Sequence, residues 1–242
     1  MISYDLLSNV GDRENNEDNV GMYQNGQEYC FVLADGLGGH GKGEEASRLA
    51  VETAVKVFAA AGAGENEMDQ SFAQAQQAIL EGQKADYHAQ DMKTTLVLLH
   101  VGNQKIWWGH IGDSRLYYFK NGKLVQRTLD HSVPQMLVAA GQIKEKQIRN
   151  HPDRNRLLRV LGTEWDTPKY QIAEPIEREG SQAFLLCTDG FWELIDEKKM
   201  QHFLKKAKTP ADWLGLMEGI VKKNGHGKNM DNYSAVAVWL AD

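Results

Sequence analysis

The chain has 242 residues, which is enough for one large domain with a generous core or for two small ones. Its formal net charge of -6 argues against a general nucleic-acid-binding protein, which would present a basic face. No apolar run is long enough to span a membrane, and the first residues lack the layout of a signal peptide, so we expect a cytoplasmic protein without membrane contact. Because no repeat, low-complexity tract or linker divides the sequence, we expect a single domain over residues 1–242.

The first predicted elements lead to an acidic residue beside a glycine-rich turn. Weak alternation predicts a strand over residues 2–8, and the polar run 9–19 is typical of a loop. Asn25-Gly26 is a hairpin signal, and the short apolar run 30–34 after it indicates a buried strand. That strand ends at Asp35, where the following glycines allow the backbone to come close to a ligand.

The glycine-rich turn is compatible with three chemistries. Gly36, Gly38 and Gly41 match a dinucleotide-binding turn, but the predicted helix 46–61 leads into polar sequence and not into the second apolar strand of such a fold. The same turn matches a phosphate-binding P-loop up to Gly43, where a Ser or Thr is required to hold magnesium. In the third alternative Asp35 binds a metal ion together with carboxylates from elsewhere in the chain.

The middle of the chain changes from helices to strands. A second amphipathic helix is predicted, marked by Met68, Phe72, Ala75 and Ile79 and ending before about Gln90. Apolar runs separated by turn residues, including Asn121-Gly122, then predict an antiparallel meander. Asp113 lies at a kink within it. The predicted strands of the meander are 94–101, 105–110, 115–120 and 123–127.

An arginine-rich insert follows the meander. Ser132 and Pro134 predict the start of a short helix that Gly141 ends. The next segment is a candidate for contact with an anionic partner, but its arginines could equally pair with local acids on an exposed surface. These arginines are Arg149, Arg154, Arg156 and Arg159.

The last third repeats the pattern of a buried strand that ends in an acid. The apolar run 184–188 ends in Asp189-Gly190, and Asp231-Asn232 directly precedes the predicted strand 234–240. Two helices are predicted between them, one from about Asp196 and one that begins at Thr209-Pro210. Because Cys30 and Cys187 both lie in apolar strands, we expect packed thiols and neither a disulfide nor a metal pair.

Four carboxylates, Asp35, Asp113, Asp189 and Asp231, lie where an apolar strand meets a turn. One such Asp is routine, because Asp favours turns. Four of them, with Glu17 and Asp18 in the N-terminal loop, predict a site at the rim of a sheet if the strands are neighbours. Ligands that are all oxygens suit magnesium or manganese and poorly suit zinc, and so many converging carboxylates require more than one cation.

The order and spacing of these residues resemble a known family, the metal-dependent protein serine/threonine phosphatases of the PP2C type. The resemblance spans the full chain, and its blocks together are far more specific than any one of them. It implies an α+β fold, a four-layer αββα sandwich of two antiparallel sheets flanked by helices, with a flap insert at about 132–170. The blocks are Arg13 with Glu17-Asp18, Asp35-Gly36-x-Gly38-Gly39-His40, Thr94-Thr95, Gly112-Asp113-Ser114-Arg115, Asp130-His131-Ser132, Asp189-Gly190 and Asp231-Asn232.

The resemblance also implies a role for each site residue. Asp35 would bridge two Mn²⁺ or Mg²⁺ ions, with Asp189 and Asp231 completing the first. Glu17 and the carbonyl of Gly36 would hold the second. Asp18 would orient bound waters, and Asp113 with Asp189 would hold a weaker third ion. Arg13 would bind the substrate phosphate, because its planar guanidinium suits a phosphoryl group.

The implied reaction is direct attack of a metal-bridging hydroxide on phosphoserine or phosphothreonine, without a covalent enzyme intermediate. The rival interpretation is a catalytically silent relative that binds phosphoproteins. The compact chain resembles bacterial members that oppose a Ser/Thr kinase, so we expect phosphorylated protein substrates, a cognate kinase and a monomer. The run 150–156 resembles members tied to type VI secretion.

Three features depart from the family pattern. Leu37 stands where eukaryotic relatives carry a histidine assigned as general acid, and Lys93 replaces the usual glycine before Thr94-Thr95. The flap varies among members, so substrate choice is not readable from the shared blocks. His40 is the nearest histidine that could protonate the leaving alkoxide, although it could instead hold the glycine turn in shape.

Overall fold

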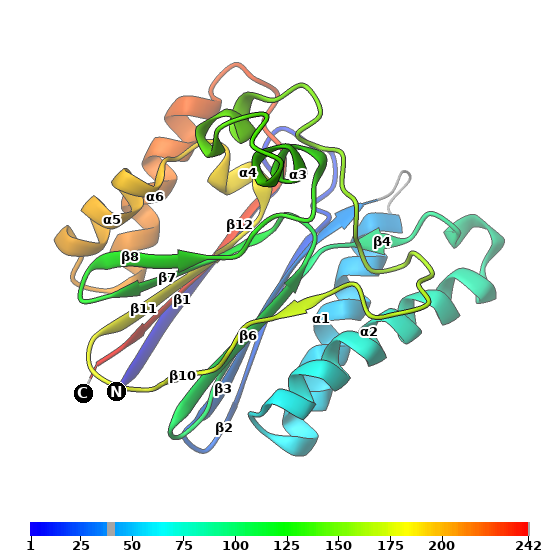
Figure 1. Cartoon of the computed structure of the whole chain (residues 1–242), viewed down its shortest axis with the longest axis horizontal. Helices are drawn as coiled ribbons and strands as arrows, with labels where there is room; N and C mark the ends of the chain where they lie inside the picture. Colours follow the sequence, from blue (N-terminus) through cyan, green and yellow to red (C-terminus); the bar gives the residue numbers. More distant parts are fainter. Residues whose placement is uncertain (38–41, 242) are drawn as a thin grey trace.

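Two antiparallel sheets lie face to face, and helices cover the outer side of each (Figure 1). The computed structural model describes residues 1–37 and 42–241. The strands are β1 (Ile2–Asn9), β2 (Asp18–Asn25), β3 (Glu28–Leu37), β4 (Lys93–Thr94), β5 (Leu96–Val101), β6 (Lys105–Ile111), β7 (Arg115–Lys120), β8 (Lys123–Arg127), β9 (Gln171–Ile172), β10 (Ile176–Glu177), β11 (Gln182–Cys187) and β12 (Tyr233–Leu240). The helices are α1 (Lys42–Ala61), α2 (Glu65–Ala85), α3 (Val133–Ala139), α4 (Asp189–Trp192), α5 (Glu197–Lys206) and α6 (Pro210–Gly225), with short 3-10 helices η1 (Tyr87–Ala89) and η2 (Glu145–Asn150).

The strand order brings distant parts of the sequence together. One sheet has the order β1-β12-β11-β7-β8, so the first and last strands pair along their whole length, from Ile2 opposite Leu240 to Asn9 opposite Tyr233. The other sheet has the order β10-β6-β5-β3-β2, with β4 paired to β3 and β9 paired to β6. The prediction of an α+β sandwich of two antiparallel sheets flanked by helices is confirmed.

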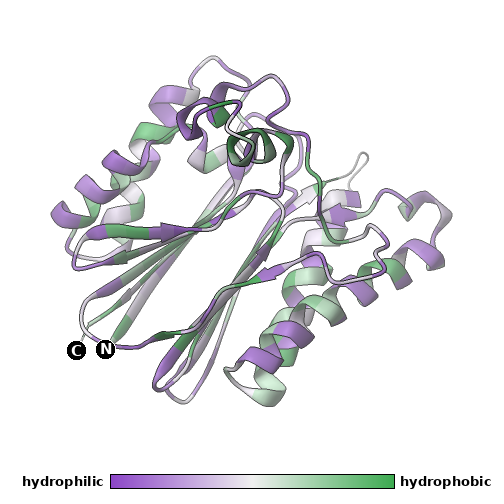
Figure 2. Cartoon of the chain, in the orientation of Figure 1, coloured by the Kyte–Doolittle hydropathy of each residue, from purple (hydrophilic) through white to green (hydrophobic). Residues whose placement is uncertain are grey.

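The apolar strands are buried on both faces, which explains why they do not alternate with polar residues. In β3, Cys30, Val32 and Ala34 pack toward α1 and α2, whereas Phe31 and Leu33 point into the core between the sheets. Strands β11 and β12 divide their side chains in the same way, between the inter-sheet core and the core under α5 and α6. Hydrophobic residues accordingly follow the strands, with hydrophilic stretches along the outer helices (Figure 2). Both cysteines are buried and free, as expected.

Two predicted helix starts are confirmed by their caps. The Ser132 side chain accepts a hydrogen bond from the Gln135 backbone N–H at the start of α3, and Thr209 accepts one from the Asp212 N–H at the start of α6. No helix in the described part of the chain combines the length and the apolar character that crossing a membrane requires.

The predicted meander is wrong at Asp113. Strand β6 belongs to one sheet and β7 to the other, so the segment between them is a crossing from sheet to sheet and not a kink within one. Gly112 has a φ of +98°, and a Cβ on it would lie 2.5 Å from Cγ2 of Thr95, so only glycine fits this crossing. Asp113 is thereby held between the two sheets.

One predicted strand end also differs from the structure, and one helix was not predicted. Strand β3 continues to Leu37, so Asp35 lies within the strand and not after it, because β4 extends the pairing (Gly36 opposite Thr94). Helix α2 ends at Ala85, before about Gln90 as predicted, and η1 follows. Helix α4 was not predicted; it begins at Asp189 itself.

The buried His100 makes the fold acid-sensitive. Its ring packs against Phe58 with centroids 4.9 Å apart, and within the described residues neither ring nitrogen has a hydrogen-bond partner. Burial lowers the pKa of His100 to about 3. In the unfolded chain the imidazole of His100 takes up a proton below its ordinary pKa of about 6.5, whereas in the folded protein it stays neutral. The free energy of unfolding therefore falls as the pH drops from about 6.5 toward 3.

We expect this one group to remove about 2 kcal/mol of the free energy of unfolding between about pH 7 and about pH 5. In His100→Phe, the difference in unfolding free energy between these two pH values should shrink by that amount, as measured by urea denaturation. His202→Phe is the matched control, because His202 is exposed. An unchanged pH dependence in His100→Phe would contradict this assignment.

Candidate metal centre

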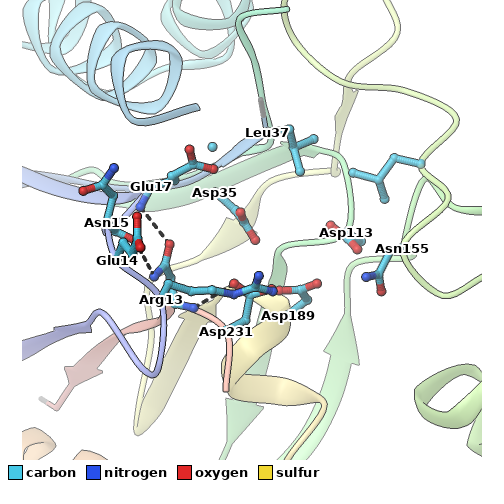
Figure 3. Close-up of a pocket in the computed structure, with 13 residues that line it drawn as sticks. Arg13, Glu14, Asn15, Glu17, Asp35, Leu37, Asp113, Asn155, Asp189 and Asp231 are labelled. Atoms are coloured by element: carbon cyan, nitrogen blue, oxygen red, sulfur yellow. Dashed lines mark hydrogen bonds and ion pairs between the residues drawn. The ribbon is translucent and has the colours of Figure 1, made fainter. Parts of the chain in front are cut away.

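All the predicted site residues except Asp18 line one pocket of about 540 Å³ at an end of the two sheets (Figure 3). They reach it from five separate stretches of the chain: the loop before β2, strand β3, the crossing between the sheets, the start of α4 and the segment before β12. The predicted residues that line the pocket are Arg13, Glu17, Asp35, Gly36, Asp113, Asp189 and Asp231.

Two threonines fix the backbone that carries Asp35. The Asp35 N–H donates to Oγ1 of Thr95 at 3.0 Å, and the Asp35 carbonyl accepts from the Thr94 hydroxyl at 2.8 Å and from the Thr95 N–H at 2.9 Å. The Thr95 hydroxyl also contacts the hydroxyl of Ser114 at 2.8 Å, next to Asp113. The Asp35 side chain takes no part in these bonds, so it remains directed into the pocket (Figure 3).

Glycine at position 36 brings three chain segments into contact. A Cβ on Gly36 would lie 2.2 Å from the Gly43 carbonyl oxygen and 2.7 Å from that of Glu17. The Gly36 N–H donates to the Glu17 carbonyl at 3.1 Å. A side chain at position 36 would therefore clash with the backbone of Gly43 and of Glu17.

Asn232 ties the N-terminal loop to the last strand. Its Oδ1 accepts from the Glu17 N–H at 2.8 Å, and its Nδ2 donates to the carbonyls of Val10 and Asn15 at 2.8 and 2.9 Å. Asp12 and Met230 add two further hydrogen bonds between the same segments. The positions of Arg13 and Glu17 relative to Asp231 therefore depend on contacts across more than 200 residues of sequence.

Arg13 lies along the edge of the pocket and forms an ion pair with Asp231. Its Nη2 is 2.9 Å from Oδ2 of Asp231, and the two side chains are 47% and 45% exposed. This exposed pair adds little to stability. It does hold the planar guanidinium of Arg13 beside the acids of the pocket (Figure 3).

A buried network supports Asp113 from below. Nε1 of Trp192 donates to the Asp113 carbonyl at 3.0 Å, and the Arg115 guanidinium lies 3.4 Å from the centre of a Trp192 ring. Arg115 also forms a two-pronged ion pair with Asp130, at 2.8 and 2.7 Å. Arg115 therefore connects the segment that carries Asp113 to the segment that carries Asp130.

Asp18 lies beneath the pocket and not among its lining residues. It pairs with Asp35 across β2 and β3, and its Oδ2 accepts from the Thr188 hydroxyl at 3.0 Å. Oδ1 of Asp18 is buried without a partner in the described part of the chain. Burial is also the main reason that the pKa of Asp18 is raised to about 7.

Carboxylates of the pocket repel one another, and this repulsion and burial raise the pKa values of several of them. Burial, and then the nearby charges of Asp18 and Asp189, raise the pKa of Asp35 well above its usual range. Burial and Asp189 raise the pKa of Asp113 in the same way. Burial and Asp231 raise the pKa of Asp189 to about 6. Positive charge in this pocket would reverse these effects, because a bound cation favours the ionised carboxylates.

This donor set fits hard divalent cations. Every candidate ligand is a carboxylate or a backbone carbonyl, and the orphaned Oδ1 of Asp18 lies just below. Within residues 1–37 and 42–241, no three His, Cys, Asp or Glu side chains already form a tight metal cluster. The carboxylates line a shared space, and one of them, Asp231, is paired with Arg13 in this structure.

The flap arginines mostly contact acids of this protein, as one of the two interpretations predicts. The contact with an anionic partner stays a prediction, and so does the role of His40, which lies outside the described residues. The flap also places Asn155 and Leu157 in the pocket wall. The ion pairs are Arg149 to Glu197 at 2.7 Å, Arg154 to Glu193 at 3.1 Å and Arg156 to Asp153 at 3.5 Å.

Sequence reasoning missed the supporting roles of Asn232, Thr95 and Asn155. The available signal was adjacency for two of them: Asn232 follows Asp231, and Thr95 lies in a block shared with the family. No local pattern marked Asn155, because its place in the wall depends on how the flap folds back.

Carboxylates that line one pocket at the end of a two-sheet sandwich are compatible with a metal-dependent hydrolase. Residues 8–215 match the family model of protein phosphatase 2C. The chain therefore belongs to this family and is a serine/threonine protein phosphatase, which argues against the catalytically silent alternative.

Three relatives illustrate the similarity. The serine/threonine phosphatase stp of Listeria monocytogenes serotype 4b (strain F2365) is 30% identical over 233 residues, covering 93% of this chain and 90% of that protein. The catalytic domain of the serine/threonine protein phosphatase PstP, in complex with 2 manganese ions, superposes with a TM-score of 0.84 at 26% identity, covering 100% of this chain and 99% of that one. PppA, a key regulatory component of T6SS in Pseudomonas aeruginosa, superposes with a TM-score of 0.78 at 25% identity, covering 98% and 96%.

Proposed function

We propose that this protein hydrolyses phosphoserine and phosphothreonine in other proteins by direct attack of water on phosphorus, without a covalent enzyme intermediate. The observation that carries the proposal is the convergence of Asp35, Asp189 and Asp231 with Arg13 in one pocket. Neither cysteine can serve as a nucleophile, because both are buried and burial raises the pKa of each thiol.

The proposed ligands form two core sites for Mn²⁺ or Mg²⁺. Asp35, Asp189 and Asp231 would hold the first ion, and Asp35 with Glu17 and the Gly36 carbonyl would hold the second. Asp113 and Asp189 would hold a weaker third ion. When bound, such cations make water nucleophilic at neutral pH and offset charge on the phosphoryl oxygens.

The remaining residues orient the reactants. Arg13, which contacts Asp231 in this structure, would bind the phosphoryl oxygens of the substrate with its planar guanidinium. The unpartnered Oδ1 of Asp18 accepts a hydrogen bond from water at the pocket floor. Leu37 lines the pocket and has no ionisable proton to donate, so the leaving alkoxide takes its proton from another group.

The proposed setting follows from the substrate. Phosphoserine and phosphothreonine are made by kinases that use ATP, so we place the protein in the cytoplasm, where it opposes a Ser/Thr kinase. We also propose that it is a monomer with a single domain, whose flap lies at about 132–170. The likeness to PppA supports a link to type VI secretion.

The test is release of phosphate from a phosphothreonine peptide by protein stripped of metal. We expect no turnover in excess chelator and recovery on addition of Mn²⁺, because all the proposed ligands are oxygens. A phosphotyrosine peptide of the same sequence is the specificity control. Full turnover in excess chelator would overturn the metal assignment.

A further inference from the structure

A second pocket, of about 210 Å³, adjoins the metal pocket on the side of Arg13. Arg13, Asn155, Asp189 and Asp231 line both pockets, so a peptide whose phosphoryl group lies in the first can place a neighbouring side chain in the second. An extended chain advances only about 3.3–3.6 Å per residue, so residues adjacent to the phosphorylated one are within reach.

Three segments that are distant in sequence build the outer wall of this second pocket. The flap contributes Arg154, the turn after α4 contributes Glu193, and the loop between α6 and β12 contributes Lys228. These segments gather at the same end of the molecule (Figure 1). The loop that carries Lys228 is held at both ends, because the Lys228 N–H donates to the Gly225 carbonyl at 2.9 Å and Met230 bonds to Asp12.

The wall of this second pocket is positively charged if the two proposed metal ligands, Asp189 and Asp231, are left out of the sum. Asp189 and Asp231 face cations in the proposed function, which leaves Arg13, Arg154 and Lys228 against Glu193 alone. Arg154 reaches Glu193 through Nε, at 3.1 Å, so that bond does not use its two terminal nitrogens. Lys228 is exposed, and among the residues that the structure describes no carboxylate lies within ion-pair distance of its Nζ.

We propose that this pocket binds the carboxylate of an Asp or Glu next to the phosphorylated residue, so that the preferred substrates are acidic phosphopeptides. The inference rests on the proposed function and deepens it. Arg154 and Lys228 approach the pocket from opposite segments and contact the carboxylate together, while Arg13 holds the phosphoryl group.

The experiment compares two phosphothreonine peptides that differ only in having Asp or Asn on both sides of the phosphorylated residue. p-Nitrophenyl phosphate, which has no flanking residue, is the reference substrate. We expect kcat/KM of the wild-type protein to be about fivefold or more higher for the Asp peptide, through KM, and this preference to fall as salt is added.

Lys228→Glu and Arg154→Gln should each reduce the ratio of kcat/KM for the Asp peptide to that for the Asn peptide toward one. Lys223→Ala is the matched control, because Lys223 is an exposed lysine on α6 outside the pocket. In this control the ratio should stay at the wild-type value.

The possible failures are distinguishable. If the wild-type protein hydrolyses neither peptide nor p-nitrophenyl phosphate with Mn²⁺, the proposed function itself fails. If it hydrolyses them without preferring the Asp peptide, or if Lys228→Glu and Arg154→Gln leave that preference intact, the function stands and the acidic subsite is overturned.

Discussion

Asp35→Asn lowers kcat by about a thousandfold or more at saturating Mn²⁺, because the proposed bridging carboxylate is the ligand that both core ions share, and metal ions contribute several kcal/mol of charge stabilisation in such sites. The amide keeps the shape of the side chain but not its charge. The backbone bonds to Thr94 and Thr95 do not involve the side chain, so the fold is retained. The measurement is phosphate release from a phosphothreonine peptide over a range of Mn²⁺ concentrations.

The same variant carries its own structural control. In wild-type protein without metal, Asp18, Asp189 and Asp113 all repel a charge at Asp35, so Asp35→Asn should melt at an equal or higher temperature than the wild type in chelator. Asp91→Asn, at a side chain 84% exposed, should keep full activity. Near-normal kcat of Asp35→Asn with saturating Mn²⁺ would show that the proposed ligand set is wrong.

Arg13→Ala raises KM for phosphopeptides by about ten- to a hundredfold, since hydrogen bonds to charged groups are worth about 1.5–3 kcal/mol. Its affinity for Mn²⁺ should not fall, because Asp231 loses only an ion-pair partner. Arg13→Lys should recover part of the loss, as the charge returns without the planar fork. Steady-state kinetics and titration calorimetry provide the two readouts.

Arg48 is a well-matched control for Arg13, because it forms an ion pair of the same exposure outside the pocket. Arg48 pairs with Glu52 on α1 at 3.0 Å, and the exposed fractions of the two side chains, 47% and 45%, are the same as those of Arg13 and Asp231. Arg48→Ala should change neither KM nor kcat. A large drop in Mn²⁺ affinity of Arg13→Ala with KM unchanged would make Arg13 a structural residue of the metal pocket.

The sequence predicts the buried strands and their acids because the responsible forces are local. The run 30–34 is apolar throughout since both of its faces are covered, and Asn121-Gly122 adopts positive φ at both residues, as a tight hairpin requires. The acids Asp189 and Asp231 follow from the same logic, because each adjoins such a strand.

What the sequence does not predict depends on contacts between distant segments. The crossing at Gly112 puts β6 and β7 in different sheets, and a run of apolar residues looks alike in either sheet. The bonds from Asn232 to Val10 and Asn15 exist only because β1 pairs with β12. The single-domain organisation, the monomer and the metal ligands stay predictions.

Titration calorimetry of Mn²⁺ into metal-free protein tests the central claim, that the acids of this pocket bind the cations of the phosphatase. We predict binding of more than one ion to the wild-type protein, and loss of the tight sites in both Asp35→Asn and Asp231→Asn with the fold intact by circular dichroism. Binding of Mn²⁺ to Asp35→Asn with the affinity and stoichiometry of the wild-type protein would contradict it.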